Sequence, residues 1–304
     1  MSVFQHRELR YYSFGLRAGL ANLFLNGLRM GAKKTAGKIL QPVNSYTRFP
    51  EYAWFDRAIA AHLAALPGGS RASILDVGSP KLLGLYLGVK TPAELTLTDI
   101  SEVNIDEYKP MWQALKKRAK GAVGFSLQDA RHIQFHDASF DVVYSMSVLE
   151  HIEGEGGDSA AIAELLRVLK PGGLLVLSVP FGSSYVEQKR VGFAGAARKT
   201  GDQEVFFFQR IYDPAAFEQR IVCRLAPGVS NLKLITIQRT RPWISRGFGA
   251  LGENLRGLLG GLNPLFSAIG NRSMEGVQPF DTRYGEFHNA KDIYGDLVLT
   301  AKKN

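Results

Sequence analysis

An alternation of short apolar runs with helical stretches, starting at Ala72, constrains the fold of this 304-residue chain more than any other feature. The apolar runs predict five strands, at residues 74–78, 95–100, 123–127, 140–145 and 174–179. Helical patterns at residues 106–119 and 158–169 lie between some of these strands. Strands that alternate with helices form βαβ units around a parallel sheet, and right-handed crossovers place helices on both faces of it. The pattern therefore predicts an α/β domain.

The N-terminal part of the chain has a different pattern. Residues 1–70 predict a helical extension, and a helix over residues 52–66 is expected to end at Pro67-Gly68-Gly69. The aromatic side chains at the start of this helix have two interpretations: they line a substrate pocket, or they anchor the helix in the core. We favour the core, because aromatic residues mostly serve as buried bulk; the residues concerned are Tyr52, Trp54 and Phe55.

The C-terminal part adds a helix and two strands. Asp213-Pro214 is a typical helix start, with an aspartate as N-cap and a proline in the first turn. Late strands are expected at residues 232–238 and 296–301. We therefore predict one domain over residues 71–304, with an insertion at about 239–292 between its last two strands.

Composition limits the classes of protein and of site. Cys223 is the sole cysteine, so internal disulfides and zinc sites built on paired cysteines are excluded, and no metal site is predicted. The net charge of +9 favours acidic partners, or only solubility. The early apolar segment at residues 14–32 is interrupted by Arg17 and Arg29, so no spanning helix is expected. The N-terminus lacks the residue order of a signal peptide, and we expect a cytoplasmic location.

Candidate ligand-binding residues follow the predicted strands, because ligands of open α/β sheets bind beyond the carboxyl ends of the strands. Gly78 ends the first strand, but Pro80 and Leu82 follow it, and the loop after this strand has no G-x-G-x-x-G pattern. Such a loop is poorly suited to a pyrophosphate. Asp99 ends the second strand, 21 residues after Gly78, where a carboxylate can accept both ribose hydroxyls. Asp129 follows the third strand and could accept from an adenine amino group.

Four motifs in order carry a family resemblance: ILDVGSPK, LTLTDIS, QDARHIQFHDASFDVVYSMSVLEHI and LKPGGLLVLSVP. Together they make residues 73–181 resemble the core of class I methyltransferases of the type 11 sort, which use S-adenosylmethionine (SAM). The late segment GDLVLTAKK resembles the antiparallel strand that closes the sheet of this family. The resemblance implies a Rossmann-like, seven-stranded, mostly parallel sheet with helices on both faces, carrying an N-terminal helical extension and a C-terminal insertion.

The resemblance also implies roles for single residues in binding SAM. Asp99 matches the acid that binds the ribose, and Asp129 and Ala130 match the pair at the adenine edge. The remaining matches surround the methionine part of the cofactor or lie beside it after the fourth strand; they are Asp76, Gly78, Ser79, Ser145 and Met146. The usual G-x-G-x-G of the first loop is G-S-P-K-L here, so two of three glycines are absent, which bears on cofactor affinity more than on the fold.

Other residues have two interpretations each. His151 is the weak candidate for a general base, since histidine titrates near neutral pH, and otherwise packs and hydrogen-bonds locally, which we favour. The aromatic run at residues 206–212 suits a substrate pocket and the core equally. We expect His132 and His136 to be solvated on a surface loop, and Asp141, at the start of the fourth strand, to be structural.

These observations predict a SAM-dependent methyltransferase that acts on a small-molecule, glycan or lipid acceptor. The alternatives are a methyltransferase-fold protein without catalysis, for which the altered glycine motif speaks, and a nicotinamide-dependent oxidoreductase, against which Pro80 and Leu82 speak. A nucleic-acid acceptor is not favoured, because no nucleic-acid-binding module is recognisable. The oligomeric state is left open.

Two apolar segments outside the predicted sheet add a question about partners. Residues 14–40 combine an apolar stripe with five basic residues, and residues 248–269 are rich in glycine and leucine. They can pack together as a lid over the acceptor site, or the basic helix can lie on an anionic membrane surface. We favour the lid and keep peripheral membrane contact as the second hypothesis.

Overall fold

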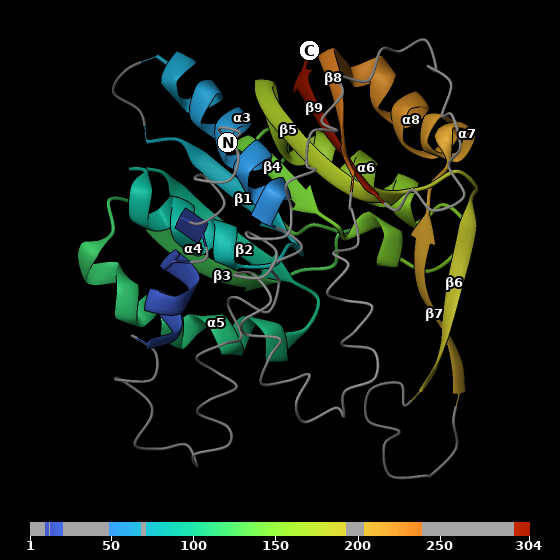
Figure 1. Cartoon of the computed structure of the whole chain (residues 1–304). Helices are drawn as coiled ribbons and strands as arrows, with labels where there is room; N and C mark the ends of the chain where they lie inside the picture. The colour runs from blue at the N-terminus through green and yellow to red at the C-terminus, as the bar shows by residue number, and fades with distance from the viewer. Residues whose placement is uncertain (1–9, 12, 21–48, 68–70, 193–203, 239–294) are drawn as a thin grey trace.

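A computed structural model describes residues 10–11, 13–20, 49–67, 71–192, 204–238 and 295–304. Its centre is a seven-stranded sheet in the order β3-β2-β1-β4-β5-β9-β8 (Figure 1). Neighbouring strands from β3 to β5 are parallel, whereas β9 runs antiparallel to β5 and to β8. The strands are β1 (Ser73–Val77), β2 (Glu94–Asp99), β3 (Ala122–Leu127), β4 (Phe140–Met146), β5 (Leu169–Phe181), β8 (Val229–Gln238) and β9 (Gly295–Lys303). The predicted α/β fold and its seven-stranded, mostly parallel sheet are confirmed.

Helices cover both faces of this sheet, and each face has its own apolar core (Figure 1). One core joins the sheet to α3 (Phe49–Ala65), α4 (Leu82–Lys90) and α5 (Glu102–Leu115). The other joins it to α6 (Gly157–Val168) and to the segment with α7 (Pro214–Phe217), a π-helical turn (Glu218–Val222) and α8 (Cys223–Leu225). Single-turn 3₁₀ helices lie at Lys116–Arg118, Leu149–His151 and Ala226–Gly228.

Two helices differ from the sequence prediction. The helix expected at 106–119 begins earlier, as α5, because Ser101 caps it and accepts from the backbone N–H of Asn104. Helix α4 was not predicted, because its residues 82–88 are all buried and show no polar face. Gly84 lets α4 lie close to β2, since a Cβ there would stand 2.4 Å from a methyl carbon of Leu97.

The N-terminal segments that the structure describes pack on the first core. Residues 13–20 are helical, and Tyr11 and Phe14 stand edge-on against the ring of Tyr86. Tyr52 and Phe55 of α3 are fully buried in the same core, as the packing interpretation predicted. The rest of the predicted extension and the insertion at 239–292 lie outside the described residues. Within the described part of the chain, no helix combines the length and apolar character needed to cross a membrane.

Asp158 ties α6 to the segment after β7. Its buried carboxylate accepts from Arg220 at 2.8 and 2.9 Å and from the hydroxyl of Tyr212 at 3.0 Å. The helix start predicted at Asp213-Pro214 is confirmed, because the Asp213 side chain accepts from the N–H of Ala216 at 2.8 Å.

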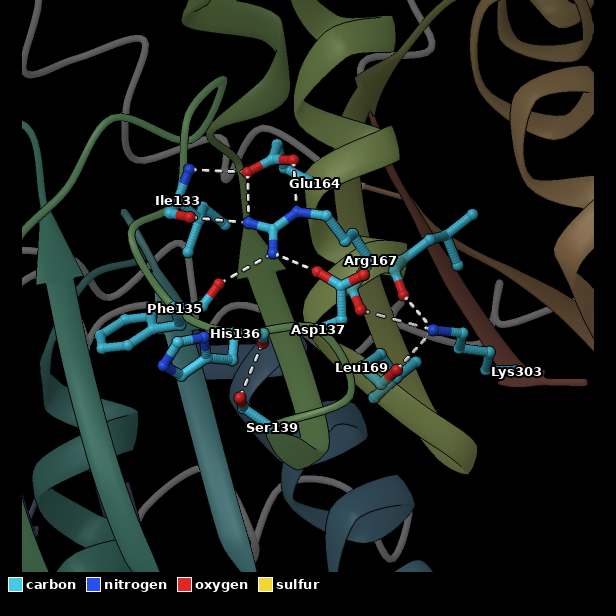
Figure 2. A network of polar contacts seen from close by, with 10 residues as sticks. Ile133, Phe135, His136, Asp137, Ser139, Glu164, Arg167, Leu169 and Lys303 are labelled. Atoms are coloured by element: carbon cyan, nitrogen blue, oxygen red, sulfur yellow. Dashed lines mark hydrogen bonds and ion pairs between the residues drawn. The ribbon is translucent and has the colours of Figure 1, made fainter.

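The end of the sheet where β4 begins is held by a polar network around Arg167 (Figure 2). Arg167 donates to the carbonyls of Ile133 and Phe135 and to the carboxylates of Glu164 and Asp137. His132 and His136 are exposed on the loop that leads to this network, as predicted. Nearby, Asp141 accepts from Ser73 and pairs with Lys170 at 2.9 Å, which confirms its structural role.

A hairpin was not predicted from the sequence. It consists of β6 (Val186–Gly192) and β7 (Glu204–Ile211), forms a sheet of its own and extends away from the main sheet (Figure 1). The aromatic run at 206–208 lies on β7 and is partly buried. Within the same run Arg210 is buried and donates to the carbonyls of Ile152 and Gly154, so β7 holds the loop that follows β4.

Candidate functional site

The carboxyl ends of β1 and β2 lie side by side and bring the first candidate residues together. Val77 pairs with Thr98 in the register of the two strands, and the N–H of Gly78 donates to the Thr98 carbonyl at 3.0 Å. Gly78 has a φ of +71°, a left-handed conformation that favours glycine. A Cβ at this position would stand 2.8 Å from a methyl carbon of Val148, so the loop after β4 leaves no room for a side chain there.

Asp76 is fully buried and holds the first loop, which follows β1 at residues 78–81, by hydrogen bonds. One of its oxygens accepts from the N–H of Ser79 at 2.9 Å, and the other accepts from the Tyr144 hydroxyl at 3.1 Å. Burial raises the pKa of this carboxyl to about 6. Asp76 therefore orients the loop through hydrogen bonds, and a ligand would have to displace these contacts to reach it.

Lys81 is a site residue that the sequence analysis did not single out. Its side chain is 1% exposed and turns inward, so that Nζ lies 3.7 Å from a carboxylate oxygen of Asp76 and 3.5 Å from one of Asp99. Nζ also donates to the Ser79 carbonyl at 2.5 Å. A signal was present in the sequence, since a lysine stands beside Pro80 and Leu82 where the related loop is rich in glycine.

Asp99 stands at the end of β2, where the sequence predicted it. One of its oxygens accepts from the N–H of Ser101 at 3.0 Å and from the side-chain amide of Asn104 at 3.2 Å. The side chain is mostly buried, with 11% of it exposed at the strand end. These contacts fix the orientation of the carboxylate before any ligand arrives.

Apolar side chains next to Asp99 are exposed to solvent. Ile100 follows Asp99 directly, and Val103 lies in the first turn of α5. Leu127 of β3 pairs with Asp99 in the register of the two strands. Exposed apolar groups beside a fixed carboxylate suit a ligand that combines an aromatic base with a ribose.

Asp129 lies beyond the end of β3, but its carboxylate is engaged by its own loop. Both oxygens accept from the Arg131 guanidinium, the shortest contact being 2.6 Å. These bonds lower the pKa of Asp129. Ala130 follows and is partly buried against the core under α6. Asp129 and Ala130, the residues predicted at the adenine edge, therefore lie next to β3. The Asp129 carboxylate is bound by Arg131.

Ser145 and Met146 lie inside the sheet rather than on its edge. The Ser145 hydroxyl donates to the Val77 carbonyl at 2.9 Å, and the N–H of Met146 donates to the Ser79 hydroxyl at 2.9 Å. Both residues are fully buried, so they join the end of β4 to the first loop. A ligand at this edge would instead contact the residues that follow Met146 in the chain, of which Val148 is partly exposed.

Glu51 of α3 reaches the same edge of the sheet. Its buried carboxylate accepts from the hydroxyl of Ser178 on β5 at 2.6 Å and from that of Ser147 at 3.4 Å. The sequence held no signal for this residue, because its place depends on how α3 docks against β5.

His151, the predicted candidate base, is held by the hairpin. Its Nδ1 lies 2.6 Å from the carbonyl of Phe208, and its ring stands edge-on to the Phe208 ring. A carbonyl only accepts, so Nδ1 is the donor in this contact. The contact agrees with the local packing interpretation of His151.

The site fits SAM better than a dinucleotide. Asp99 and the exposed apolar residues around it suit the adenosine part, while Pro80 removes an amide donor and the Lys81 ammonium faces inward. The N–H groups of Gly78 and Ser79 already donate to Thr98 and Asp76, and Pro80 has none, so residues 78–80 form no cradle for a pyrophosphate. Together, the sheet order and this edge suit an adenosine-containing ligand better than a dinucleotide.

Comparison with known proteins finds a partial match to one family model. Residues 75–177 match the family model described as a methyltransferase domain. The match covers about a third of the chain and includes the ends of β1, β2, β3 and β4, where the candidate residues lie.

Relatives that match parts of this chain have the names of different methyltransferases. The chain is 31% identical over 140 residues to the tRNA (carboxymethyluridine(34)-5-O)-methyltransferase of Arabidopsis thaliana, which is 46% of this chain and 30% of the relative. It is 32% identical over 111 residues to the O-methyltransferase cnsE of Penicillium expansum, which is 34% of this chain and 37% of the relative. The demethylmenaquinone methyltransferase of Leptospira interrogans is 42% identical over 84 residues, or 27% of this chain and 31% of the relative. The chain spans about a third of the length of each relative.

Proposed function

We propose that this protein is a SAM-dependent methyltransferase that acts on a small-molecule, glycan or lipid acceptor. The observation that carries the proposal is Asp99, a preoriented carboxylate beside exposed apolar residues, next to a first loop without a pyrophosphate cradle. The match of residues 75–177 to a methyltransferase domain supports it.

SAM supplies an activated methyl group, so the residues of the chain mainly bind, orient and exclude water. Asp99 would accept hydrogen bonds from the ribose hydroxyls, and the exposed side chains of Ile100 and Leu127 would pack against the base. Gly78 lets the backbone approach the amino-acid part of the ligand, and Val148 closes the loop from the side of β4. The sheet edge beside Ser147 and Glu51 is where an acceptor would meet this arrangement.

The second part of the proposal is the class of molecule that accepts the methyl group. The three relatives are named as a tRNA (carboxymethyluridine(34)-5-O)-methyltransferase, an O-methyltransferase and a demethylmenaquinone methyltransferase, so their names do not agree on one class of acceptor. We favour a small-molecule, glycan or lipid acceptor, because the described residues form no recognisable nucleic-acid module.

Release of S-adenosylhomocysteine (SAH) from SAM tests the activity. The protein is incubated with SAM and with separate small-molecule, glycan, lipid and tRNA fractions, and Asp99→Ala is the control. SAH release with one of the first three fractions that depends on Asp99 supports the proposal. Release with tRNA alone would replace the acceptor class, and no release with any fraction would favour the methyltransferase-fold protein without catalysis.

The proposed lid and the membrane contact concern segments that lie mostly outside the described residues. Co-sedimentation with anionic vesicles at low and high salt separates them, since each basic residue near an anionic surface contributes about 1 kcal/mol and is screened by salt. Binding that salt weakens and that deletion of residues 1–40 removes supports membrane contact. The lid hypothesis expects no sedimentation at either salt concentration.

A further inference from the structure

We propose that Lys81 is a positioning residue that keeps the two carboxylates of the site ionised together, so that Asp99 stays available as an acceptor for a vicinal diol. The inference rests on the proposed function, because the diol in question is that of the SAM ribose. It explains how the loop after β1 can support ribose binding although Pro80 and Leu82 replace two glycines.

The position of Lys81 is unfavourable in two local respects. It occupies the N-cap of α4, where a cation opposes the helix dipole and its side chain makes no capping bond. Its ammonium is also removed from water, which costs free energy unless the charge is paired. Among the residues that the structure describes, its contacts with Asp76, Asp99 and the Ser79 carbonyl offset both costs.

The two acids need such a partner, because their strands are neighbours. Asp76 is fully buried and Asp99 is 8% exposed, and the same ammonium lies within 3.7 Å of one and 3.5 Å of the other. Two carboxylates that share a buried site do not both ionise readily near neutral pH. A proton retained by the pair would turn one acceptor oxygen into a donor and weaken the bonds to a diol.

Other groups around the pair bear on its titration. Asp76 receives the Tyr144 hydroxyl from β4, and Tyr108 of α5 interacts electrostatically with both acids. These are tyrosines whose pKa burial raises, so they stay protonated across the neutral range. Further charged or titratable neighbours of those tyrosines are Glu107 and Tyr52.

Binding measurements on four variants test the role of Lys81. The probes are SAH and 5′-methylthioadenosine, which carries the adenine and the diol but has no group that titrates between pH 6 and 9. Calorimetric titrations compare the wild type with Lys81→Met, Lys81→Arg and the double variant Asp76→Asn/Lys81→Met. Lys90→Met, at the exposed end of α4, is the matched control.

We expect flat binding of 5′-methylthioadenosine by the wild type and Lys90→Met between pH 7 and 9. Lys81→Met should bind about tenfold more weakly at pH 7 and recover as the pH rises, because the shared proton leaves. Lys81→Arg should keep the flat profile, and Asp76→Asn/Lys81→Met should restore binding at pH 7, because the competing acid is gone.

A merely structural lysine would give a different result. A loss in Lys81→Met that is independent of pH and not restored by Asp76→Asn overturns the inference, as does wild-type binding in Lys81→Met. If Lys81→Met does not fold, the double variant Asp76→Asn/Lys81→Met decides. A double variant that folds and binds the probe supports the inference, and one that folds without binding overturns it. A wild type that binds neither probe overturns the proposed function itself, and the inference with it.

Discussion

Replacing Gly78 with alanine should destabilise the fold through two separable effects. The φ of +71° places a side chain in the left-handed region, at a cost of about 1–2 kcal/mol. The new Cβ would stand 2.8 Å from a methyl carbon of Val148, and overpacking of that kind costs about 1–3 kcal/mol. We therefore expect Gly78→Ala to lower the free energy of unfolding by about 2–5 kcal/mol, a large part of typical domain stability.

Urea denaturation of Gly78→Ala, Val148→Ala and the double variant separates the two effects. Removing the Val148 methyl groups relieves the clash but leaves the backbone strain, so the double-mutant cycle should show a favourable coupling of about 1–2 kcal/mol. Residual destabilisation in the double variant then measures the strain at φ +71°. A Gly78→Ala variant as stable as the wild type would refute the described loop, and zero coupling would refute the contact with Val148.

Three further predictions concern single carboxylates. Asp99→Ala should weaken SAH binding by about 1.5–3 kcal/mol in calorimetry with an unchanged fold, and equal affinity would show that it is not the ribose ligand. Because burial raises the pKa of Asp76 to about 6, the folded chain binds this proton more tightly than the unfolded chain between about pH 4 and 6. Stability should therefore fall across this window as pH rises, by on the order of 1–3 kcal/mol relative to Asp76→Asn in urea titrations, and parallel curves for the two proteins would contradict this. Asp158→Ala should cost about 3–5 kcal/mol of stability without changing SAH affinity, because it leaves Arg220 unpaired; a loss below 1 kcal/mol would refute the role of that pair.

The sheet and the place of Asp99 were predictable from sequence because both depend on regular spacing. Buried parallel strands are short apolar runs, and a residue that ends such a run lies at the ligand edge. The strands at 74–78 and 95–100 therefore located Gly78 and Asp99 without knowledge of any contact. The core role of Tyr52 and Phe55 followed from their size and apolar character.

Other parts depend on contacts that no local pattern encodes. Helix α4 is apolar on every side, so it lacks the period that marks a surface helix. The hairpin of β6 and β7 pairs residues across the intervening segment 193–203, and its strands do not alternate cleanly. The inward turn of Lys81 depends on two carboxylates that only the folded sheet brings together.

The proposed function requires that the strand-end site binds SAM and not a dinucleotide. Calorimetric titration of the wild-type protein with SAM, SAH and NAD tests it most directly. We expect saturable binding of SAM and SAH that Asp99→Ala weakens, and no binding of NAD. Tight binding of NAD without a signal from SAM or SAH would contradict the proposed role of this site.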